Sequence, residues 1–531
     1  MRETRAAASE GTARTSFAPK RAARALSVVA VLVGTLIPMA GASNAAAKPQ
    51  VEPEVPATAM NIGLGPANNS PLLVADPRQS RFVVLANRLD APDFSCALQV
   101  SDDGGRAWIS ANPVPRLPAG ADKCYAPEAA FDRDGVLYYL FVGLRGRGNE
   151  PMGAFLTTST DHAQHFSKPR RILGPSNFGV RMGIDRASGA KGRIQLVWLH
   201  SNSDPGSGGF TAPANPIMAA HSDDGGRTFS KPLQVSDPRS RFVVAPALAL
   251  GPDNAVHVAY YDLQDDARDY YGLEGPAWEG TWSLVLSSSS DGGERFSRGV
   301  VVDDRIRPSR RVMLIFTMPP ASLVAGFGRL CAAWTDARRG DDDALARCSK
   351  DNGRSWSGLR RLNDDAVGNG RSQYLPRLSL SPDGRIDAIF LDRRRDPSNI
   401  VNDVHYTYSS DGGETFTRNL RLNRYGSDSG IGQQYLNRSA KGQVEIGSRL
   451  GLLSRETSVL AAWPDTHNSN SVTKEQDIFA TEVSSLPASG GVSVTALLMG
   501  LVLTAVLIAV GVAWWQIRRR RRQPALEAHQ G

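Results

Sequence analysis

Short apolar runs separated by polar turns recur along most of the chain. One stretch has such runs at Leu378–Leu380, Ile386–Leu391 and Val404–Tyr408, with a Pro-Asp-Gly turn at 382–384 between the first two. Runs of this length that are bounded by turn residues are typical of antiparallel β-strands. The pattern therefore predicts an all-β domain.

A second pattern, Ser/Thr-x-Asp-x-Gly-x-x-Trp/Phe, is repeated six times, and we call each copy a box. The second copy is degenerate, with Ala163 in place of glycine. The copies start 58 to 67 residues apart, which is typical of a propeller or solenoid. Ser and Asp side chains close turns by accepting backbone N–H groups, so we expect the aspartates to be structural rather than calcium ligands or acids. The boxes start at Ser101, Ser159, Ser222, Ser289, Ser349 and Ser409, and their aspartates are Asp103, Asp161, Asp224, Asp291, Asp351 and Asp411.

The number of repeats follows from the strands around the boxes. Each repeat is expected to have three strands before its box and one after it. Three further strands are predicted after the last box, at Gly447–Leu453, Val459–Trp463 and Asp477–Val483. Met60–Leu64 could supply the fourth strand of this seventh repeat and protect its edge. We predict a propeller of seven four-stranded blades, or six if the last strands only complete the ring.

The boxes resemble the Asp-box (BNR) repeats of the sialidase-like propeller superfamily, over roughly residues 61–484. The resemblance implies a bacterial exo-α-sialidase-like glycoside hydrolase or BNR-repeat surface protein that acts on glycans without a cofactor or metal. The Arg-Ile-Pro motif of sialidases is absent, because residues 68–72 read Asn-Asn-Ser-Pro-Leu. The rival hypotheses are a non-catalytic propeller that binds a glycan or protein, and a membrane-tethered assembly factor.

The resemblance also implies a hydrolytic set of an acid, a nucleophilic tyrosine and its glutamate partner. No motif fixes their positions in this chain. The alternatives are Asp90 or Asp93 for the acid, Tyr374 or Tyr435 for the nucleophile, and Glu128 or Glu445 for its partner.

Substrate-binding residues are expected on the propeller face where strand 1 begins and where strands 2 and 3 are joined; the boxes lie on the other face. Three arginines near the axis could hold a carboxylate bidentately, as the arginine triad of sialidases does. Recurring aspartates after strand 2 could bind substrate or tie blades together. Tyr271 and Trp278, in the loop 264–281, could form a sugar-stacking lid or pack over the rim. The candidates are Arg181, Arg377, Arg449, Asp336, Asp392, Asp465, Tyr271 and Trp278.

Four cysteines are present, and an oxidising compartment would allow them to pair. Cys331 and Cys348 lie on consecutive predicted strands, and the strands that start near Cys96 and Cys124 begin on the same face. We therefore predict the disulfides Cys96–Cys124 and Cys331–Cys348. Metal binding is not expected, because no Cys-x-x-Cys spacing occurs.

Both ends of the chain resemble targeting segments. Residues 1–47 have the basic, apolar and small-residue order of a signal peptide, or alternatively of an uncleaved anchor. Residues 48–60 are a linker, and 485–491 form a stalk or an LPxTG-like sorting motif, with sortase as a possible partner. Residues 492–515 carry no charge and are long enough to span a membrane, with a basic cytoplasmic tail at 516–531. This order predicts an extracellular propeller on a single membrane span, or one anchored to the cell wall.

The net charge of +8 comes entirely from these ends. Segments 1–47 and 516–531 each carry an excess of four positive charges, so the rest of the chain has equal numbers of basic and acidic residues. The high isoelectric point is therefore a property of the targeting segments. It gives no support to nucleic acid as a partner.

Overall fold

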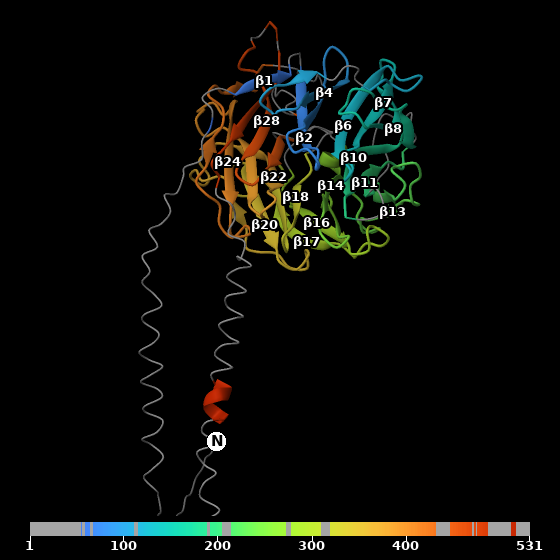
Figure 1. Ribbon diagram of the computed structural model, residues 1–531. Helices are drawn as coiled ribbons and strands as arrows, with labels where there is room; N and C mark the ends of the chain where they lie inside the picture. The colour runs from blue at the N-terminus through green and yellow to red at the C-terminus, as the bar shows by residue number, and fades with distance from the viewer. Residues whose placement is uncertain are drawn as a thin grey trace, which may run out of the picture. The chain divides into compact units, whose positions relative to one another are not determined.

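The computed structural model describes residues 59–486 except 64–66, 111–114, 188–191, 204–213, 272–277, 310–318, 432–446, 470–471 and 474, together with residues 55 and 511–516. Every described residue belongs to a single compact unit. That unit contains seven antiparallel sheets that form the blades of a propeller (Figure 1). The predicted all-β, seven-bladed fold is confirmed.

Each of the first four blades has four strands, which pair in the order of the chain. Blade 1 has β2 (Asn68–Ala75), β3 (Val83–Leu89), β4 (Ser95–Ser101) and β5 (Ile109–Ser110). Blade 2 has β6 (Lys123–Phe131), β7 (Leu137–Arg145), β8 (Glu150–Ser159) and β9 (Arg170–Leu173). Blade 3 has β10 (Asn177–Asp185), β11 (Arg193–His200), β12 (Ile217–Ser222) and β13 (Leu233–Gln234). Blade 4 has β14 (Val243–Leu250), β15 (Val256–Asp262), β16 (Trp282–Ser289) and β17 (Val300–Ile306).

The remaining blades include the one closed by the start of the chain. Blade 5 has β18 (Ser322–Gly326), β19 (Arg329–Asp336), β20 (Asp343–Ser349) and β21 (Arg360–Arg361). Blade 6 has β22 (Gln373–Leu380), β23 (Ile386–Asp392), β24 (Val401–Ser409) and β25 (Leu420–Arg421), and β26 (Ser427–Asp428) also pairs with β24. Blade 7 has β27 (Gly451–Ser454), β28 (Val459–Asp465), β29 (Asp477–Val483) and β1 (Met60–Gly63). A short helix, α2 (Ala267–Tyr271), lies between β15 and β16.

The first strands of the blades line the propeller axis. Each of β2, β6, β10, β14, β18, β22 and β27 contacts the first strands of both neighbouring blades. The ring closes through blade 7, where Met60 pairs with Ala480 and Asn61 with Phe479. The predicted pairing of the two ends of the propeller in one blade is therefore confirmed, and apolar layers between adjacent blades form the core.

The six boxes share one hydrogen-bonded turn at the end of the third strand. In every box the serine hydroxyl donates to the aspartate carboxylate, at 2.7–2.9 Å, and accepts the N–H group four residues after it. The degenerate copy keeps this geometry, because Ala163 adopts a φ of 63° and its N–H group lies 2.9 Å from Ser159 Oγ. Hydrogen bonding from the backbone N–H of His165 lowers the pKa of Asp161 to about 2.

Both predicted disulfides are present. Cys331 and Cys348 form a directly opposed pair on β19 and β20. Cys96, on β4, is bonded to Cys124 on β6 and so joins blade 1 to blade 2.

Most of the predicted targeting segments lie outside the described residues. This applies to 1–47, to 487–491 of the stalk or sorting-like segment 485–491, and to 492–510 of the predicted span; the described residues 511–516 are helical. No helix among the described residues is long and apolar enough to cross a membrane. Export and anchoring therefore stay predictions.

Candidate functional site

A bulge near the start of the first strand recurs in five blades and positions the candidate site. In β2, β6, β10, β14 and β22, two residues on the first strand stand opposite one on the second, and one residue of the bulge has a positive φ. Such a bulge redirects the side chain that follows it. The residue directly after the bulge is Glu128 in blade 2, Arg181 in blade 3 and Arg377 in blade 6.

Glu128 binds both Arg181 and Arg449, which lies just before β27 in blade 7, and Arg377 lies within electrostatic range of them. We call these four residues the axial arginine cluster. Arg181 Nη1 donates to Glu128 Oε1 at 2.9 Å. Arg449 reaches past blade 1, where its Nε donates to the Ser70 carbonyl at 3.2 Å, and forms an ion pair with Glu128. Glu128 and Arg449 are only 5% and 8% exposed. One carboxylate therefore links arginines from blades 3 and 7.

Arg377 has no counterion among the described residues. Its Nε is shielded from solvent and has no hydrogen-bond partner, although the side chain as a whole is half-buried. Burial, followed by the positive charge of Arg449, lowers the pKa of Arg377 to about 10. Arg449, Glu128 and Arg181 all influence this group electrostatically. Substrate binding by the three arginines stays a prediction.

The cluster has more positive than negative charge. Burial opposes ionisation of Glu128, but Arg449 and Arg181 outweigh it and hold the pKa of Glu128 below its ordinary value. Glu128 is therefore a carboxylate, and it neutralises only one of three guanidinium groups. Because guanidinium groups bind carboxylates in planar, bidentate pairs, this arrangement suits an anionic ligand.

The sequence-based catalytic candidates do not converge. Asp90 is buried and accepts two hydrogen bonds from Arg88, at 2.5 and 2.7 Å. Tyr374 packs in the core of blades 6 and 7, and its hydroxyl donates to Asn402 at 2.7 Å and accepts from Arg393 at 2.8 Å. Since Glu128 binds the arginines, the three candidates have different partners, and their catalytic roles stay predictions.

The alternative catalytic candidates are no closer to a hydrolytic set. Asp93 is exposed and pairs with Lys123 at 3.0 Å. Tyr435 and Glu445 lie outside the described residues.

A tyrosine that the sequence reasoning missed lies near the cluster. Tyr125 precedes the bulge of β6 and is half-buried, and Arg88 Nη1 donates to its hydroxyl at 2.8 Å. The Arg88 guanidinium also lies 4.5 Å from the centroid of the Tyr125 ring. The bulge itself has a sequence signal that could have pointed to this position. In four blades the last residue of the bulge is a proline, at Pro71, Pro127, Pro246 and Pro376.

The aspartates that follow strand 2 form turns. Each of Asp336, Asp392 and Asp465 accepts the backbone N–H two residues later, at 2.7–2.9 Å, and is at most 2% exposed. Asp336 and Asp465 also accept indole N–H groups from the tryptophans two residues before them. Their contacts therefore match the structural alternative, and substrate binding by them stays a prediction.

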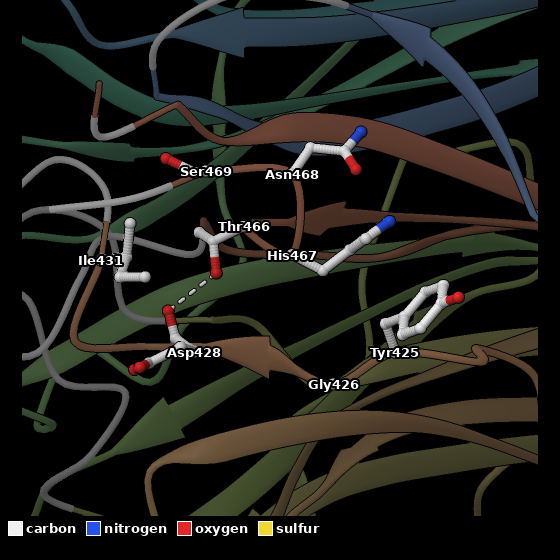
Figure 2. Close-up of a pocket in the computed structure, with 8 residues that line it drawn as sticks. All are labelled: Tyr425, Gly426, Asp428, Ile431, Thr466, His467, Asn468 and Ser469. Atoms are coloured by element: carbon white, nitrogen blue, oxygen red, sulfur yellow. Dashed lines mark hydrogen bonds between the residues drawn. The ribbon is translucent and has the colours of Figure 1, made fainter. Parts of the chain in front are cut away.

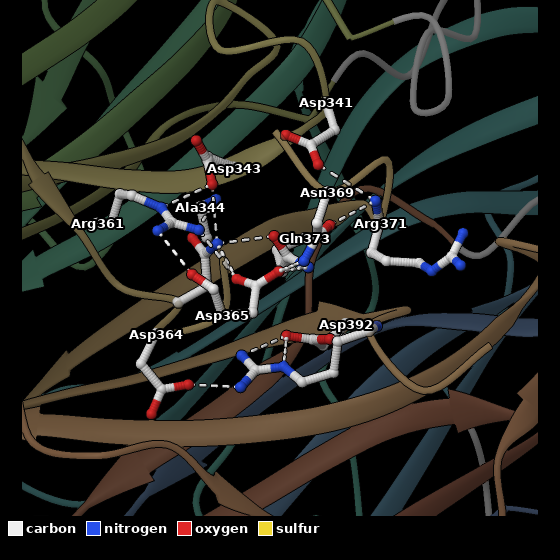
Figure 3. A network of polar contacts seen from close by, with 12 residues as sticks. Asp341, Asp343, Ala344, Arg361, Asp364, Asp365, Asn369, Arg371, Gln373 and Asp392 are labelled. Atoms are coloured by element: carbon white, nitrogen blue, oxygen red, sulfur yellow. Dashed lines mark hydrogen bonds and ion pairs between the residues drawn. The ribbon is translucent and has the colours of Figure 1, made fainter. Parts of the chain in front are cut away.

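Asp392 belongs to a polar network between blades 5 and 6 (Figure 3). Arg394 donates to Asp392 at 2.8 Å and pairs with Asp364, which precedes blade 6. Nearby, Arg361 forms ion pairs with Asp343 and Asp365, at 2.8 and 2.9 Å (Figure 3). The network connects the last strand of blade 5 to the start of blade 6.

The proposed lid residues pack against the core of blades 4 and 5. The Tyr271 ring lies at an edge-to-face angle to Phe242 and Tyr270, with centroid distances of 5.9 and 5.1 Å. Trp278 is partly buried against the same core, and residues 272–277 between them lie outside the described residues. Within the described residues no group of three or more His, Cys, Asp or Glu side chains is placed to hold a metal ion.

The chain is similar in fold to several solved structures. An ulvan lyase, a polysaccharide lyase bound to -[GlcA(1-4)Rha3S]-, is 12% identical with a TM-score of 0.47, over 83% of this chain and 98% of that one. A Hadza microbial sialidase is 15% identical with a TM-score of 0.42, over 76% and 73%. Trypanosoma rangeli sialidase is 12% identical with a TM-score of 0.37, over 83% and 57%. No protein-family model matches the chain, and no curated protein matches it.

Proposed function

We propose that the propeller binds an acidic glycan by the carboxylate of one sugar, held in the axial arginine cluster. The observation that carries the proposal is Arg377, a guanidinium with a shielded, unpartnered Nε beside two other arginines and only one carboxylate. A buried donor without a partner is costly, and clustered like charges add to the cost. A ligand carboxylate would remove both costs.

The predicted export signal and membrane span would place this site at the cell surface. The arginines lie on the face opposite the boxes, so this face would be open to glycans if the chain is anchored by its C-terminal end. The proposal therefore fits the predicted order of targeting segments. In this proposal the Asp-boxes account for the fold of the propeller and take no part in binding.

Titration of the full chain with N-acetylneuraminate, D-glucuronate and uncharged D-glucose tests the proposal. We expect one acid to bind and glucose not to bind. Arg377→Met should weaken the binding of that acid by roughly 10- to 100-fold, the equivalent of about 1.5–3 kcal/mol for a hydrogen bond to a charged group. Arg145→Met, which changes an exposed arginine, is the control.

Thermal unfolding separates a binding role of Arg377 from a structural one. Without ligand, Arg377→Met should unfold at the same or a higher temperature than the wild type, because it removes an unpaired charge. If the variant instead unfolds several degrees lower and neither acid binds to the wild type, Arg377 is a structural residue and the proposal is wrong.

Glycoside hydrolysis at the same site is the second candidate function, and the contact of Tyr125 with Arg88 favours it. A cation next to a phenol stabilises the phenolate, the form that a nucleophilic tyrosine needs. If the protein is a hydrolase, the full chain should release the fluorophore from an aryl sialoside or another aryl glycoside, and Tyr125→Phe should abolish this. Binding of an acid without turnover of any glycoside would support the binding function and contradict hydrolysis.

A further inference from the structure

A polar hollow lies on the same face of the propeller as the arginine cluster, and Figure 2 shows the residues that line it. Its lining comes from the segment that connects blades 6 and 7, including Tyr425 and Asp428, and from the loop after β28, including Thr466, His467 and Asn468. Its volume is about 560 Å³, within the usual range for small-ligand sites.

The pairing of β27 with β28 places the hollow next to the cluster. Gly451 pairs with Ala462, so Arg449, two residues before Gly451, lies level with the end of β28. The residues Thr466–Ser469 leave β28 at that same end. The hollow therefore lies one strand further from the axis than Arg449.

The hollow is held in shape without a ligand. Thr466 Oγ1 donates to the Asp428 carbonyl at 2.8 Å (Figure 2), and the Thr466 N–H donates to Ser427 Oγ at 3.1 Å. The segment that connects blades 6 and 7 is also fixed to blade 6, because Asp428 pairs with Val401 of β24. A preformed site loses little entropy when a ligand binds.

One wall is aromatic. The rings of Tyr425 and His467 stack with centroids 5.4 Å apart, and His467 also packs on Phe479 at 4.4 Å. The Arg424 guanidinium lies 5.3 Å from the Tyr425 centroid. Tyr425 is nevertheless 53% exposed, so the edge of its ring and its hydroxyl are open to a ligand.

The other groups suit hydroxyls rather than a second anion. Asp428 Oδ1 accepts the Gly430 N–H at 2.6 Å, and Oδ2 receives no hydrogen bond from the described residues. The Asn468 amide is exposed in the same hollow. A carboxylate repels an acidic sugar but accepts from neutral sugar hydroxyls, and an amide can both donate and accept. His467, whose Nδ1 lies 3.1 Å from Asp465, is held in place by that carboxylate.

We propose that this hollow is a subsite for a neutral sugar residue linked to the acidic sugar at the arginine cluster. The inference rests on the proposed function and deepens it. The ligand is an oligosaccharide with its acidic residue at the axis and a neutral residue over the junction of blades 6 and 7. Tyr425 and Asp428 contact the neutral residue, and the cluster contacts only the acidic one.

Matched pairs of probes test this by calorimetry on the full chain. The pairs are N-acetylneuraminate with 3′-sialyllactose, and D-glucuronate with cellobiuronic acid. The longer member of the bound pair should bind about 10-fold more tightly, the equivalent of about 1.4 kcal/mol. Tyr425→Ala and Asp428→Asn should remove that gain and leave the affinity for the monosaccharide unchanged. Asp428→Asn keeps the acceptor for Gly430, so it remains informative if Tyr425→Ala fails to fold.

Phe327→Ala is the matched control, because Phe327 is an exposed aromatic residue, 61% accessible, in the turn between β18 and β19 at the box side of blade 5. It should keep the full gain. Equal affinities for both members of a pair, or a gain that survives both variants, would overturn the subsite and leave the proposed function standing. If no member of either pair binds, both the subsite and the proposed function are wrong.

Discussion

At the scale of single residues, the arginines at the axis are stabilised unequally. Arg181 and Arg449 share the carboxylate of Glu128, whereas Arg377 has only the attraction of a charge that is already engaged. Breaking a buried ion pair leaves an uncompensated charge and is costly, but removing an unpaired charge is not. Glu128 is therefore expected to be a structural and positioning residue, whose loss affects stability before it affects binding.

Substitution of Glu128 tests this assignment. Glu128→Gln should lower the free energy of unfolding by about 3–5 kcal/mol, the usual cost of breaking a buried pair, as measured by urea unfolding at pH 7. Glu150→Gln is the matched control, because it makes the same change in an exposed ion pair, with Arg145. It should change the free energy of unfolding by at most about 1 kcal/mol.

The pH dependence of unfolding gives the same residue a second test. Because the arginines hold the pKa of Glu128 below the ordinary value of 4.5, its stabilisation is fully present above pH 4.5 and is lost as pH falls through the lowered pKa. The wild type should therefore lose more stability than Glu128→Gln below pH 4.5. Parallel curves for the two proteins would contradict the coupling of Glu128 to the arginines.

At the scale of elements, the box turn depends on what packs behind it. The second box accommodates Ala163 at positive φ, but in the sixth box a Cβ on Gly413 would collide with Cys348 Sγ of the disulfide in blade 5. In the other boxes that carry glycine at this position, a Cβ would also come within 3.0 Å of a side chain of the preceding blade, as it would at Gly105, Gly226, Gly293 and Gly353. The position is thus both a conformational and a steric requirement in these boxes.

Gly413→Ala is expected to destabilise the protein. Gly413 has a φ of 88°, which costs a residue with a Cβ about 1–2 kcal/mol, and overpacking against the disulfide adds about 1–3 kcal/mol. Urea unfolding should show that Gly413→Ala lowers the free energy of unfolding by about 2–5 kcal/mol, the sum of the two costs. Ala163→Gly should change the free energy of unfolding little. An unchanged midpoint for Gly413→Ala would show that the two blades can separate without cost.

At the scale of the whole molecule, the fold followed from the sequence and much of the site did not. The repeats revealed seven blades, the closing strand and both disulfides, because hydrophobic spacing and turn chemistry are local signals. They also indicated which arginines face the axis. No motif fixes the nucleophile, and the candidate Tyr374 lies just before the bulge of β22 with its side chain in the core. Tyr125 has the equivalent position in β6, directly before the bulge, yet its hydroxyl accepts from Arg88. The sequence reveals these bulges only through prolines such as Pro127 and Pro376, and it does not distinguish the two tyrosines.

The sequence likewise does not reveal the hydrogen-bond partners of the aspartates at the end of strand 2, or the position of the hollow. Asp336, Asp392 and Asp465 lie on the face where substrate-binding residues are expected, yet backbone N–H groups satisfy them locally. The hollow joins Tyr425 to His467, which are brought together when blade 7 packs beside the segment that connects it to blade 6. Such long-range juxtapositions have no local sequence signal.

Closure of the ring by the start of the chain is expected to protect the edge of blade 7. Ile62 is 9% exposed and packs with Leu460 and Ile478, and Asn61 Nδ2 donates to Asp477 Oδ2 at 2.7 Å. Without β1, the outer edge of β29 would expose unpaired backbone groups, which promote association between chains. A chain that begins at residue 67 should therefore unfold at a lower temperature than one that begins at residue 48, and should self-associate on size-exclusion chromatography. If the two chains behave alike, β1 does not close the ring, and blade 7 is stable with three strands.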